Sequence, residues 1–380
     1  MRPSPRNRPS WSRWNGDAGP RYTVGAEEEV MLLDARGGSL AQSSDDVLGR
    51  LPAALAAHAA PETHASVIEL QTGIHADTPA AVAELAALRA QLAHELTGMG
   101  LRAACAGTYP LVAPREVRVS ESARYSLVGE SMRSLARREP TLALHAHVGV
   151  PDPEDAVRVL SGLRAAVPLL LALSANSPFS QGRDTGFASS RTMIFQAFPR
   201  TGTARLFDSY DDYVGAVDAL IACGALPDPS FLWWDVRLQP KLGTVEVRVM
   251  DAQSTIADTA PLIALVQSLA RLILDDRGPG EDVAPEVLAE NRFLAARDGI
   301  QARLIDPRQR RLVPVRTLIR ALAEKCRPHA AELGCVEQFD QLGRLVAANG
   351  ADRQRAAAGR TGLSALVATL ADRFSTEGSD

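Results

Sequence analysis

Lysine is almost missing from this sequence of 380 residues, since only Lys241 and Lys325 stand among its 41 basic residues. A Walker-type phosphate loop needs a lysine directly before Ser or Thr at the end of a glycine-rich turn, and neither lysine has that context. A lysine Schiff-base mechanism is disfavoured for the same reason. If nucleotide phosphates are bound here, arginines and metal ions must bind them.

Paired cysteines and a signal peptide are missing as well. The four cysteines form no Cys-x-x-Cys pair, which favours a reduced, cytoplasmic protein over a disulfide scaffold. Residues 1–20 are rich in Pro, Arg and Ser and lack an apolar core, so we interpret them as a flexible N-terminal tail. The longest apolar stretch, around residues 167–175, is too short to span a bilayer. A net charge of −4 gives no indication of a nucleic-acid or membrane partner.

The order of the predicted elements favours an α+β fold with an antiparallel sheet, because strands come mostly early and helices late. Hydrophobic residues make up 46% of the chain, which is enough for a sizeable core, and we expect residues 21–375 to form one domain. Predicted strands cover residues 22–33, 66–72, 101–107, 142–150, 232–237 and 243–251. One predicted helix begins at Thr78, which we expect to cap it. The other predicted helices cover about 153–173, 209–224, 258–275, 284–298, 313–333, 336–348 and 362–374. A long polar loop is expected over 174–202, and such loops are often functional.

Four of the predicted strands carry ionisable residues where a strand normally buries apolar ones. Side chains two positions apart in a strand share one face. The pairs that share a face in this way are Glu27 with Glu29, His145 with His147, and Glu246 with Arg248, while Glu69 stands alone between Ile68 and Leu70. Glu28 points to the opposite face from its two neighbours.

Buried carboxylates are costly unless they are paired or bound to metal, so these strands predict a metal site if they lie on one face of one sheet. Oxygen-rich sites suit Mg²⁺ or Mn²⁺ better than zinc, and such ions bridge nucleotide phosphates. Each feature has a simpler interpretation by itself. The Glu-Glu-Glu run is then a solvated edge, Glu69 pairs with an arginine, Glu246 pairs with Arg248, and the His-x-His forms a polar sheet face.

Arginines supply a second group of candidates. Arg183 and Arg191 lie among small residues in the loop over 174–202, where they could clamp a carboxylate or phosphate, or simply face solvent. Arg237, in Trp-Trp-Asp-Val-Arg, either extends the polar face or pairs with Asp235. The chain has no Gly-x-Ser-x-Gly elbow, His-Glu-x-x-His or Gly-x-Gly-x-x-Gly motif, which sets aside several other chemistries.

At these residues the sequence resembles the type 2 glutamate–cysteine ligases, also called carboxylate–amine ligases. The similar segments are Thr23-Val-Gly-Ala-Glu-Glu-Glu, Glu69-Leu-Gln-Thr-Gly, His145-Ala-His-Val-Gly-Val, Ser174-Ala-Asn-Ser-Pro-Phe with Gly182-Arg-Asp-Thr-Gly, Trp234-Asp-Val-Arg, Thr244-Val-Glu-Val-Arg-Val-Met-Asp, Glu290-Asn-Arg-Phe-Leu-Ala-Ala-Arg and Asn349-Gly-Ala-Asp-Arg-Gln-Arg. They occur in the family order from Arg21 to about Gly359. The segment Phe195-Gln-Ala-Phe-Pro-Arg departs from the family's more aromatic version, which concerns substrate fit more than catalysis.

The resemblance implies a glutamine-synthetase-like antiparallel sheet with helices packed on one side and a helical C-terminal part. It implies ATP as co-substrate and a Mg²⁺ (or Mn²⁺) site. The residues expected to hold the metal are Glu27, Glu29, Glu69, His145 and Glu246. Glu246 and Arg248 are expected to be catalytic, with Arg248 near the transferring phosphate. Substrate or phosphate binding is expected for Arg183, Arg191, His147 and Arg237.

The expected reaction joins a carboxylate to an amine through an acyl phosphate, with L-glutamate and L-cysteine as the first choice of substrates. Two alternatives stay open: the same chemistry on another amino acid or amine, and a non-catalytic nucleotide-binding paralogue. The expected partners are ATP and amino acids, without nucleic acid or membrane. The apolar stripes of the C-terminal helices also leave a homodimer open.

Overall fold

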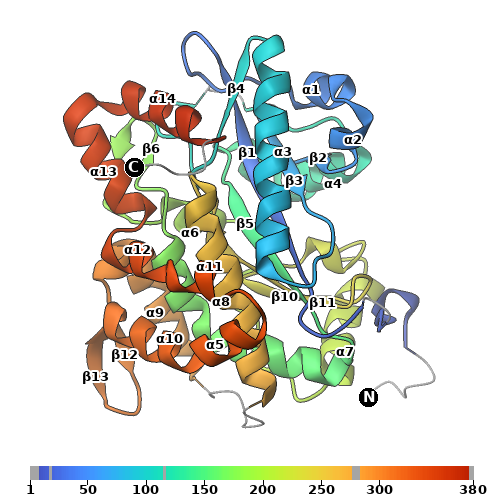
Figure 1. Cartoon of the computed structure of the whole chain (residues 1–380). Coiled ribbons are helices and arrows are strands. Elements are labelled where there is room, and N and C mark those ends of the chain that lie inside the picture. The colour runs from blue at the N-terminus through green and yellow to red at the C-terminus, as the bar shows by residue number, and fades with distance from the viewer. Residues whose placement is uncertain (1–7, 17–18, 114–116, 276–282, 376–380) are drawn as a thin grey trace.

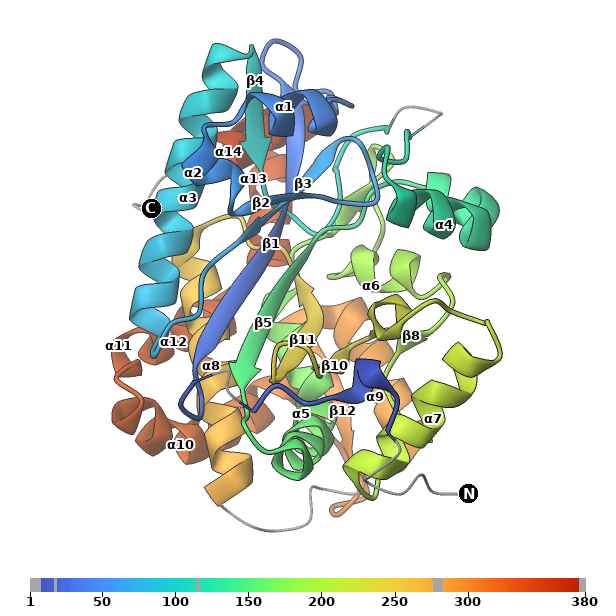
Figure 2. The same ribbon diagram turned by 90° about the vertical axis from the view of Figure 1, so that its right-hand side faces the viewer.

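The computed structural model describes residues 8–16, 19–113, 117–275 and 283–375, and a seven-stranded sheet lies at its centre (Figures 1 and 2). Every strand pair in this sheet is antiparallel, and the order is β10-β11-β5-β1-β3-β2, with β4 also pairing with β1. The strands are β1 (Val24–Asp34), β2 (Ala59–Pro61), β3 (Val67–Gln71), β4 (Leu101–Ala104), β5 (Ala143–Gly149), β10 (Val236–Gln239) and β11 (Thr244–Asp251).

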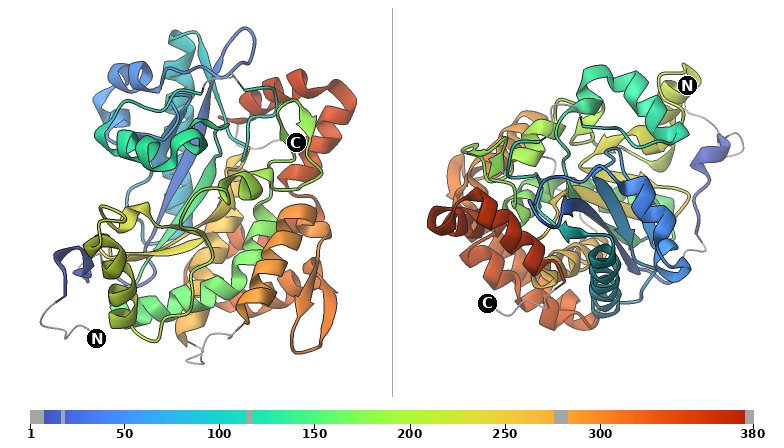
Figure 3. Two further views of the ribbon diagram at one scale, coloured as in Figure 1. Left: turned by 180° about the vertical axis from the view of Figure 1, so that it is seen from behind. Right: turned by 90° about the horizontal axis from the view of Figure 1, so that it is seen from above.

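Long helices cover one face of the sheet, and the other face is left to the candidate site. Helices α3 (Thr78–Gly98), α5 (Pro153–Ser174) and α8 (Ile256–Asp275) contact one another or the strands and bury the apolar side chains between them (Figures 1 and 3). On the opposite side lie α4 (Ala123–Met132) and α6 (Ser190–Phe195), which Figure 2 shows to the right of β5 and β11. The α+β prediction, with helices packed on one side, is confirmed.

The remaining elements surround this core. Four two-residue strands pair locally: β6 (Phe179–Ser180) with β7 (Arg183–Asp184), and β8 (Thr201–Gly202) with β9 (Trp233–Trp234). A hairpin of β12 (Arg303–Asp306) and β13 (Arg311–Pro314) follows α9. The other helices are α1 (Ser44–Arg50), α2 (Ala53–Ala56), α7 (Tyr210–Ala222), α9 (Pro285–Asp298), α10 (Val315–Glu332), α11 (Val336–Asp340), α12 (Leu342–Ala347), α13 (Gly350–Thr361) and α14 (Leu363–Arg373).

Several predicted boundaries are corrected by local capping and turns. Asp77, not Thr78, caps α3, because its carboxylate accepts a hydrogen bond from the Ala80 N–H. The stretch over 174–202 is not one loop, since it contains β6, β7, α6 and β8. The predicted helix over 336–348 is two helices that meet at Gln341, and α13 was missed because Gly350 and polar residues hide its apolar face.

The described part of the N-terminal segment is docked on the fold. Trp14 donates its indole N–H to the Val150 carbonyl at 2.8 Å, and Trp11 donates to Asp218 on α7 at 3.1 Å. The Tyr210 hydroxyl donates to the Ser12 carbonyl, and Ser12 is fully buried. Residues 8–16 are therefore packed against α7 and the end of β5, unlike the flexible tail that composition predicts. The predicted tail also includes residues 1–7 and 17–18, which lie outside the described residues.

Two helices are long and apolar enough to cross a membrane by composition alone, namely α5 and α8. In each, 72% of the most apolar window is buried inside the protein. Helices of this kind form the core of a globular fold, and α5 and α8 take that place by packing on each other and on the sheet (Figure 1). The apolar run around residues 167–175 is thus the C-terminal part of the helix that was predicted over 153–173.

Candidate active site

The register of the sheet brings the predicted acidic and imidazole side chains onto one face. Glu29 pairs with Glu69 on β3, and Glu27 pairs with His145 on β5. Further along, Glu246 on β11 pairs with His147 on β5 and, on its other side, with Arg237 on β10. Because residues that pair across strands project to the same side of the sheet, the four separate sequence patterns form one polar surface. The joint arrangement that the sequence could only suggest is confirmed.

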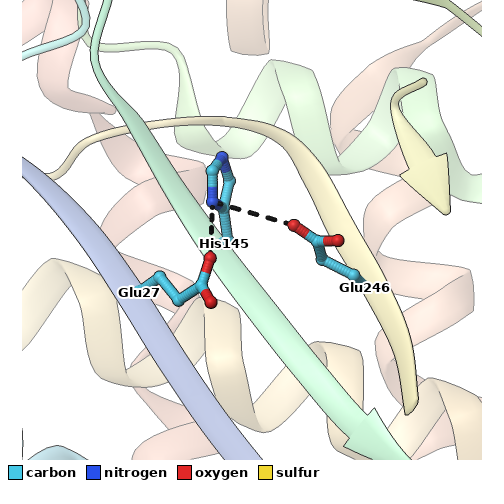
Figure 4. Close-up of side chains that lie close together, drawn as sticks. All are labelled: Glu27, His145 and Glu246. Atoms are coloured by element: carbon cyan, nitrogen blue, oxygen red, sulfur yellow. Dashed lines mark hydrogen bonds and ion pairs between the residues drawn. The ribbon is translucent and has the colours of Figure 1, made fainter. Parts of the chain in front are cut away.

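His145 lies at the centre of this surface, between carboxylates from three strands. Its Nδ1 atom is 3.1 Å from Glu27 Oε2 and 3.8 Å from both Glu69 Oε2 and Glu246 Oε1. Its Nε2 atom is 3.8 Å from Glu29 Oε1. Figure 4 shows Glu27 and Glu246 reaching toward the same imidazole from β1 and β11.

Glu246 is fully buried and is held by two arginines. Arg237 donates from Nε and Nη2 to its two carboxylate oxygens, at 2.8 and 3.1 Å, and Gln239 donates at 2.7 Å. Arg248 also pairs with Glu246 Oε1. Burial opposes the charge on Glu246, but Arg237 and Arg248 outweigh it and hold the pKa of that carboxyl well below its usual range. Glu246 is therefore a buried, negatively charged carboxylate at the base of the site.

The pKa values of Glu29 and Glu69 are shifted in the opposite direction from that of Glu246. Burial and the facing charge of Glu62 raise the pKa of Glu29 to about 8. Burial and the neighbouring Glu27 raise the pKa of Glu69 well above its ordinary value. Glu29 and Glu69 are 8% and 9% exposed, and neither forms an ion pair with an arginine of the described residues. This crowding of acids is unfavourable until a cation comes between them.

The imidazoles differ from each other. Burial and the adjacent Arg248 lower the pKa of His145 to about 4, so its ring is neutral near pH 7. Burial also opposes a charge on His147, but Glu27 outweighs it and raises the pKa of that ring. A neutral imidazole beside several carboxylates has the lone pair that a metal ligand needs.

The residues of this surface fit divalent cations. Two groups place one ligand atom each within 4.8 Å of one another: Glu27, His145 and Glu246, and Glu29, Glu69 and His145. The Nε2 atoms of His145 and His147 are buried and have no hydrogen-bond partner within the described part of the chain. Oxygen-rich donor sets with one imidazole suit Mg²⁺ or Mn²⁺.

A cavity of about 250 Å³ opens over this surface. Besides the acids and His145, its lining includes Arg191, Arg237 and Arg248. Three predicted site residues are absent from this lining. Glu246 and His147 are buried in the sheet face itself, and Arg183 is exposed on β7. Arg191 is held on α6, where its guanidinium donates to the Val249 and Arg248 carbonyls at 3.2 and 3.1 Å.

Sequence reasoning missed part of the lining: Glu62, Arg124, Tyr125 and Trp233. Glu62 and Arg124 stand in no periodic or motif-like context, because Glu62 follows a three-residue strand and Arg124 is the second residue of α4. Arg124 reaches across to donate to the Ser230 hydroxyl at 2.6 Å and lies over the Phe231 ring. Contacts between distant segments bring these side chains together: Arg124 reaches Ser230, and the Tyr125 hydroxyl donates to the Pro61 carbonyl, next to Glu62.

A second cavity, of about 200 Å³, lies at the other side of Glu27 and His147. Residues 71–74 and the start of β1 form part of its wall. Ile74 and Leu242 are both exposed, at 70% and 47%, and stand at this cavity. The acidic surface is thus bordered by a polar, arginine-lined cavity on one side and a partly apolar one on the other.

The sheet face behind the site is fixed by a buried ion pair. Glu28 points away from the cavity, as alternation predicts, and accepts two hydrogen bonds from Arg89 on α3, at 2.5 and 2.6 Å. Neither side chain is exposed to solvent. Arg89 also donates to the carbonyls of Gln253 and Phe374. The strand that carries Glu27 and Glu29 is thereby fastened to α3 and to the C-terminal helices.

The sequence pattern of the family described as glutamate–cysteine ligase family 2 matches residues 23–367. This chain belongs to that family. A Rubrobacter xylanophilus member named "Putative glutamate–cysteine ligase 2-1" is 40% identical over 336 residues, which cover 88% of this chain and 89% of that protein. A Thermobifida fusca member named "Putative glutamate–cysteine ligase 2" is 35% identical over 344 residues, covering 88% and 86%. The family resemblance inferred from the motifs is therefore confirmed.

Solved structures support the fold of this family 2 ligase. A glutamate–cysteine ligase from Francisella tularensis in complex with AMP superposes with a TM-score of 0.68 at 15% identity, covering 94% of this chain and 89% of that one. A bifunctional glutathione synthetase from Pasteurella multocida gives 0.67 at 13% identity and covers 95% and 53%. Identity this low shows a shared architecture, which confirms the predicted ligase fold.

Proposed function

We propose that this chain is an ATP-dependent carboxylate–amine ligase that joins L-glutamate, through its γ-carboxylate, to L-cysteine. The observation that carries the proposal is the convergence of Glu27, Glu29, Glu69, His145 and Glu246 on one sheet face, under a cavity lined by arginines. Family membership over residues 23–367 supports the glutamate–cysteine substrate pair.

Glu27, His145 and Glu246 would hold one divalent cation, and Glu29 and Glu69 with His145 would hold a second. When bound, such cations neutralise the phosphate charge that builds up during phosphoryl transfer. The residues themselves do the positioning. Arg237 and its partners keep Glu246 ionised, and the buried Arg89–Glu28 pair fixes the strand that carries Glu27 and Glu29.

The two cavities suggest where each substrate binds. The smaller cavity has two exposed apolar side chains, Ile74 and Leu242, which suit a flat nucleotide base, with the phosphates directed toward Arg248. The larger cavity contains Arg191, whose planar guanidinium suits a carboxylate. The acid substrate and the γ-phosphate would then meet above His145.

The chemistry proceeds in two displacements. An oxygen of the γ-carboxylate attacks the γ-phosphorus of ATP, the bond to the ADP oxygen breaks, and an acyl phosphate forms. The amine nitrogen then attacks the acyl carbon, phosphate leaves with its bridging oxygen, and the nitrogen loses a proton. Arg248 lies where it would stabilise the transferring phosphoryl group, and Phe195, Phe198 and Trp233 in the lining would limit water near the acyl phosphate.

The test is ADP release by purified protein with Mg²⁺ and ATP, with glutamate and cysteine added singly and together, and the product identified by mass. Release that requires both amino acids, with a γ-glutamyl-cysteine product, is the expected result. Glu27→Gln should lower kcat by on the order of 100-fold or more, because one charge of the site is lost. Glu27 is half-buried, so the fold should tolerate the change. Glu324→Gln, on the exposed side of α10, is the matched control and should leave kcat unchanged.

Two outcomes would contradict parts of the proposal. ADP release with another acid or amine, but not with this pair, would keep the ligase mechanism and reject the substrates. ATP binding without ADP release for any amine tested would favour a non-catalytic nucleotide-binding paralogue. Unchanged turnover in Glu27→Gln would reject the acidic site itself.

A further inference from the structure

The segment at the start of α13 is outside both cavities, yet it contacts the chain that leads to Arg191. Asn349 donates its amide to the Ala172 carbonyl at 3.0 Å, and the Ala351 N–H donates to the Ala175 carbonyl at 2.9 Å. Gln354 donates to both the backbone and side-chain oxygens of Asn176, at 2.8 and 2.7 Å. A helix of the C-terminal part thus binds the end of α5 and the start of the segment that carries α6.

Asn176, which accepts the hydrogen bonds from α13, is itself hydrogen-bonded to the end of the sheet. Its backbone N–H donates to Asp251 Oδ2 at 2.8 Å, and its side-chain amide donates to the Ala252 carbonyl at 2.7 Å. The Ser177 hydroxyl donates to the same Asp251 oxygen at 2.7 Å. Asp251 is the last residue of β11, which also carries Glu246 and Arg248.

The chain of contacts ends at Arg191. The Arg191 N–H donates to the Ser177 hydroxyl at 3.1 Å, and its Nη1 atom lies 3.8 Å from Asp251 Oδ1. The Ser189 hydroxyl also donates to Asp251 Oδ1, at 2.9 Å. Gln354, Asn176, Asp251 and Arg191 are all at least 95% buried, so these bonds are sheltered from water and hold one geometry.

Gly350 shows how closely α13 is seated. A Cβ atom at Gly350 would lie 2.7 Å from the Asn176 Cβ and closer still to its amide oxygen. Asn176 cannot move aside cheaply, because its amide is bonded on both sides and the residue is fully buried. Around this contact, Arg353 pairs with Asp258 on α8 at 2.6 Å, and Arg355 pairs with Asp184 on β7.

We propose that α13 is a positioning element for Arg191, acting through Gln354, Asn176 and Asp251. The packing of α13 against Asn176 determines the position of the Arg191 guanidinium in the larger cavity. That position in turn determines the affinity for the acid substrate. The substrate part of this statement rests on the proposed function, whereas the coupling of α13 to the Arg191 segment does not. Asn176, Asp251 and Gln354 are positioning residues, since none of them lines the cavity.

The test compares Gly350→Ala with Gly359→Ala, two identical changes in the same helix. A Cβ at Gly359 meets nothing within 4 Å, so that variant should behave as wild type. Hydrogen–deuterium exchange of residues 176–193 is measured first, without any substrate. In Gly350→Ala these amides should exchange on the order of tenfold faster, while those of β1 and α3 keep their wild-type rates. The KM for glutamate should rise on the order of tenfold, with the KM for ATP within about twofold of wild type.

A second variant guards against a simple folding defect. Gln354→Met keeps the size of the side chain but removes both bonds to Asn176, and it should show the same selective pattern more weakly. Unchanged exchange over residues 176–193 in Gly350→Ala, or equal acceleration throughout the protein, would overturn the proposal. So would an equal rise of both KM values. If wild-type protein makes no ADP with glutamate and cysteine, the proposed function fails, and the exchange measurement still decides whether α13 holds the Arg191 segment.

Discussion

Replacing Arg89 with Met should destabilise the protein strongly, because it leaves Glu28 buried without its partner. Arg89 makes four hydrogen bonds, two to Glu28 and one each to the Gln253 and Phe374 carbonyls. After the change, the Thr259 hydroxyl, 3.4 Å from Glu28 Oε1, does not replace the lost positive charge. Breaking a fully buried pair by removing one partner costs about 3–5 kcal/mol, and both side chains here are 0% exposed. We expect the free energy of unfolding to fall by that amount.

The assay is urea unfolding followed by both circular dichroism and tryptophan fluorescence, since coincident transitions are needed to derive a free energy. The double variant Glu28→Gln with Arg89→Met should lose clearly less than Arg89→Met alone, because no charge is then left buried. Arg102→Met is the matched control. Its partner Asp372 is 70% exposed, so this pair should contribute at most about 1 kcal/mol.

A loss of under about 1 kcal/mol in Arg89→Met would refute the reasoning, and so would a double variant that is less stable than the single one. The expected result has a consequence for the site, because the same strand carries Glu27 and Glu29 on its other face. Mg²⁺ affinity should fall together with stability in Arg89→Met and should be unaffected in Arg102→Met.

Three further predictions follow from the site. Arg191→Ala should lower kcat/KM for the acid substrate by on the order of 100-fold. Arg183→Ala should change it less than about twofold, because the Arg183 side chain is exposed outside the cavity. Similar losses of kcat/KM in the two variants would contradict these roles. Adding Mg²⁺ should raise the melting temperature and EDTA should reverse it, because a cation relieves the crowding that raises the carboxyl pKa values; a melting curve insensitive to Mg²⁺ or Mn²⁺ would argue against the metal site. Burial lowers the pKa of His64 to about 4 from 6.5, so its neutral form stabilises the fold above pH 6.5 and this stability is lost as pH falls toward 4. At about 1.4 kcal/mol per pH unit the loss is about 3 kcal/mol; urea unfolding of His64→Gln should depend less on pH across this window, and His94→Gln, at an exposed position, should match wild type.

The sheet and its site face were largely predictable because both depend on local periodicity. A strand alternates its side chains whatever surrounds it, so the spacing of Glu27 and Glu29, and of His145 and His147, already fixed which residues share a face. The opposite direction of Glu28 followed from the same rule and is confirmed by its bond to Arg89. The helices predicted over 153–173 and 258–275 likewise match α5 and α8 closely.

Helix caps, turns and long-range contacts were harder to predict from the sequence. Asp77 and Thr78 are both good caps, and only the hydrogen bond to Ala80 decides between them. Arg183 and Arg191 stand in similar sequence surroundings, yet one is exposed on a small hairpin and the other is 5% exposed on α6. That difference comes from Asp251 and Ser177, which lie far from each other in the sequence and hold only Arg191.

The sequence by itself determined the family, the α+β class and the set of acidic and imidazole side chains, because motif order and strand alternation are written along the chain. The tertiary structure alone decided that these side chains form two overlapping groups around His145, since that depends on the register between β1, β3, β5 and β11. It also decided that Glu62 and Arg124 reach the cavity and that α13 is seated on Asn176. These are contacts between distant segments, and their geometry is set by packing of the whole chain rather than by any local pattern.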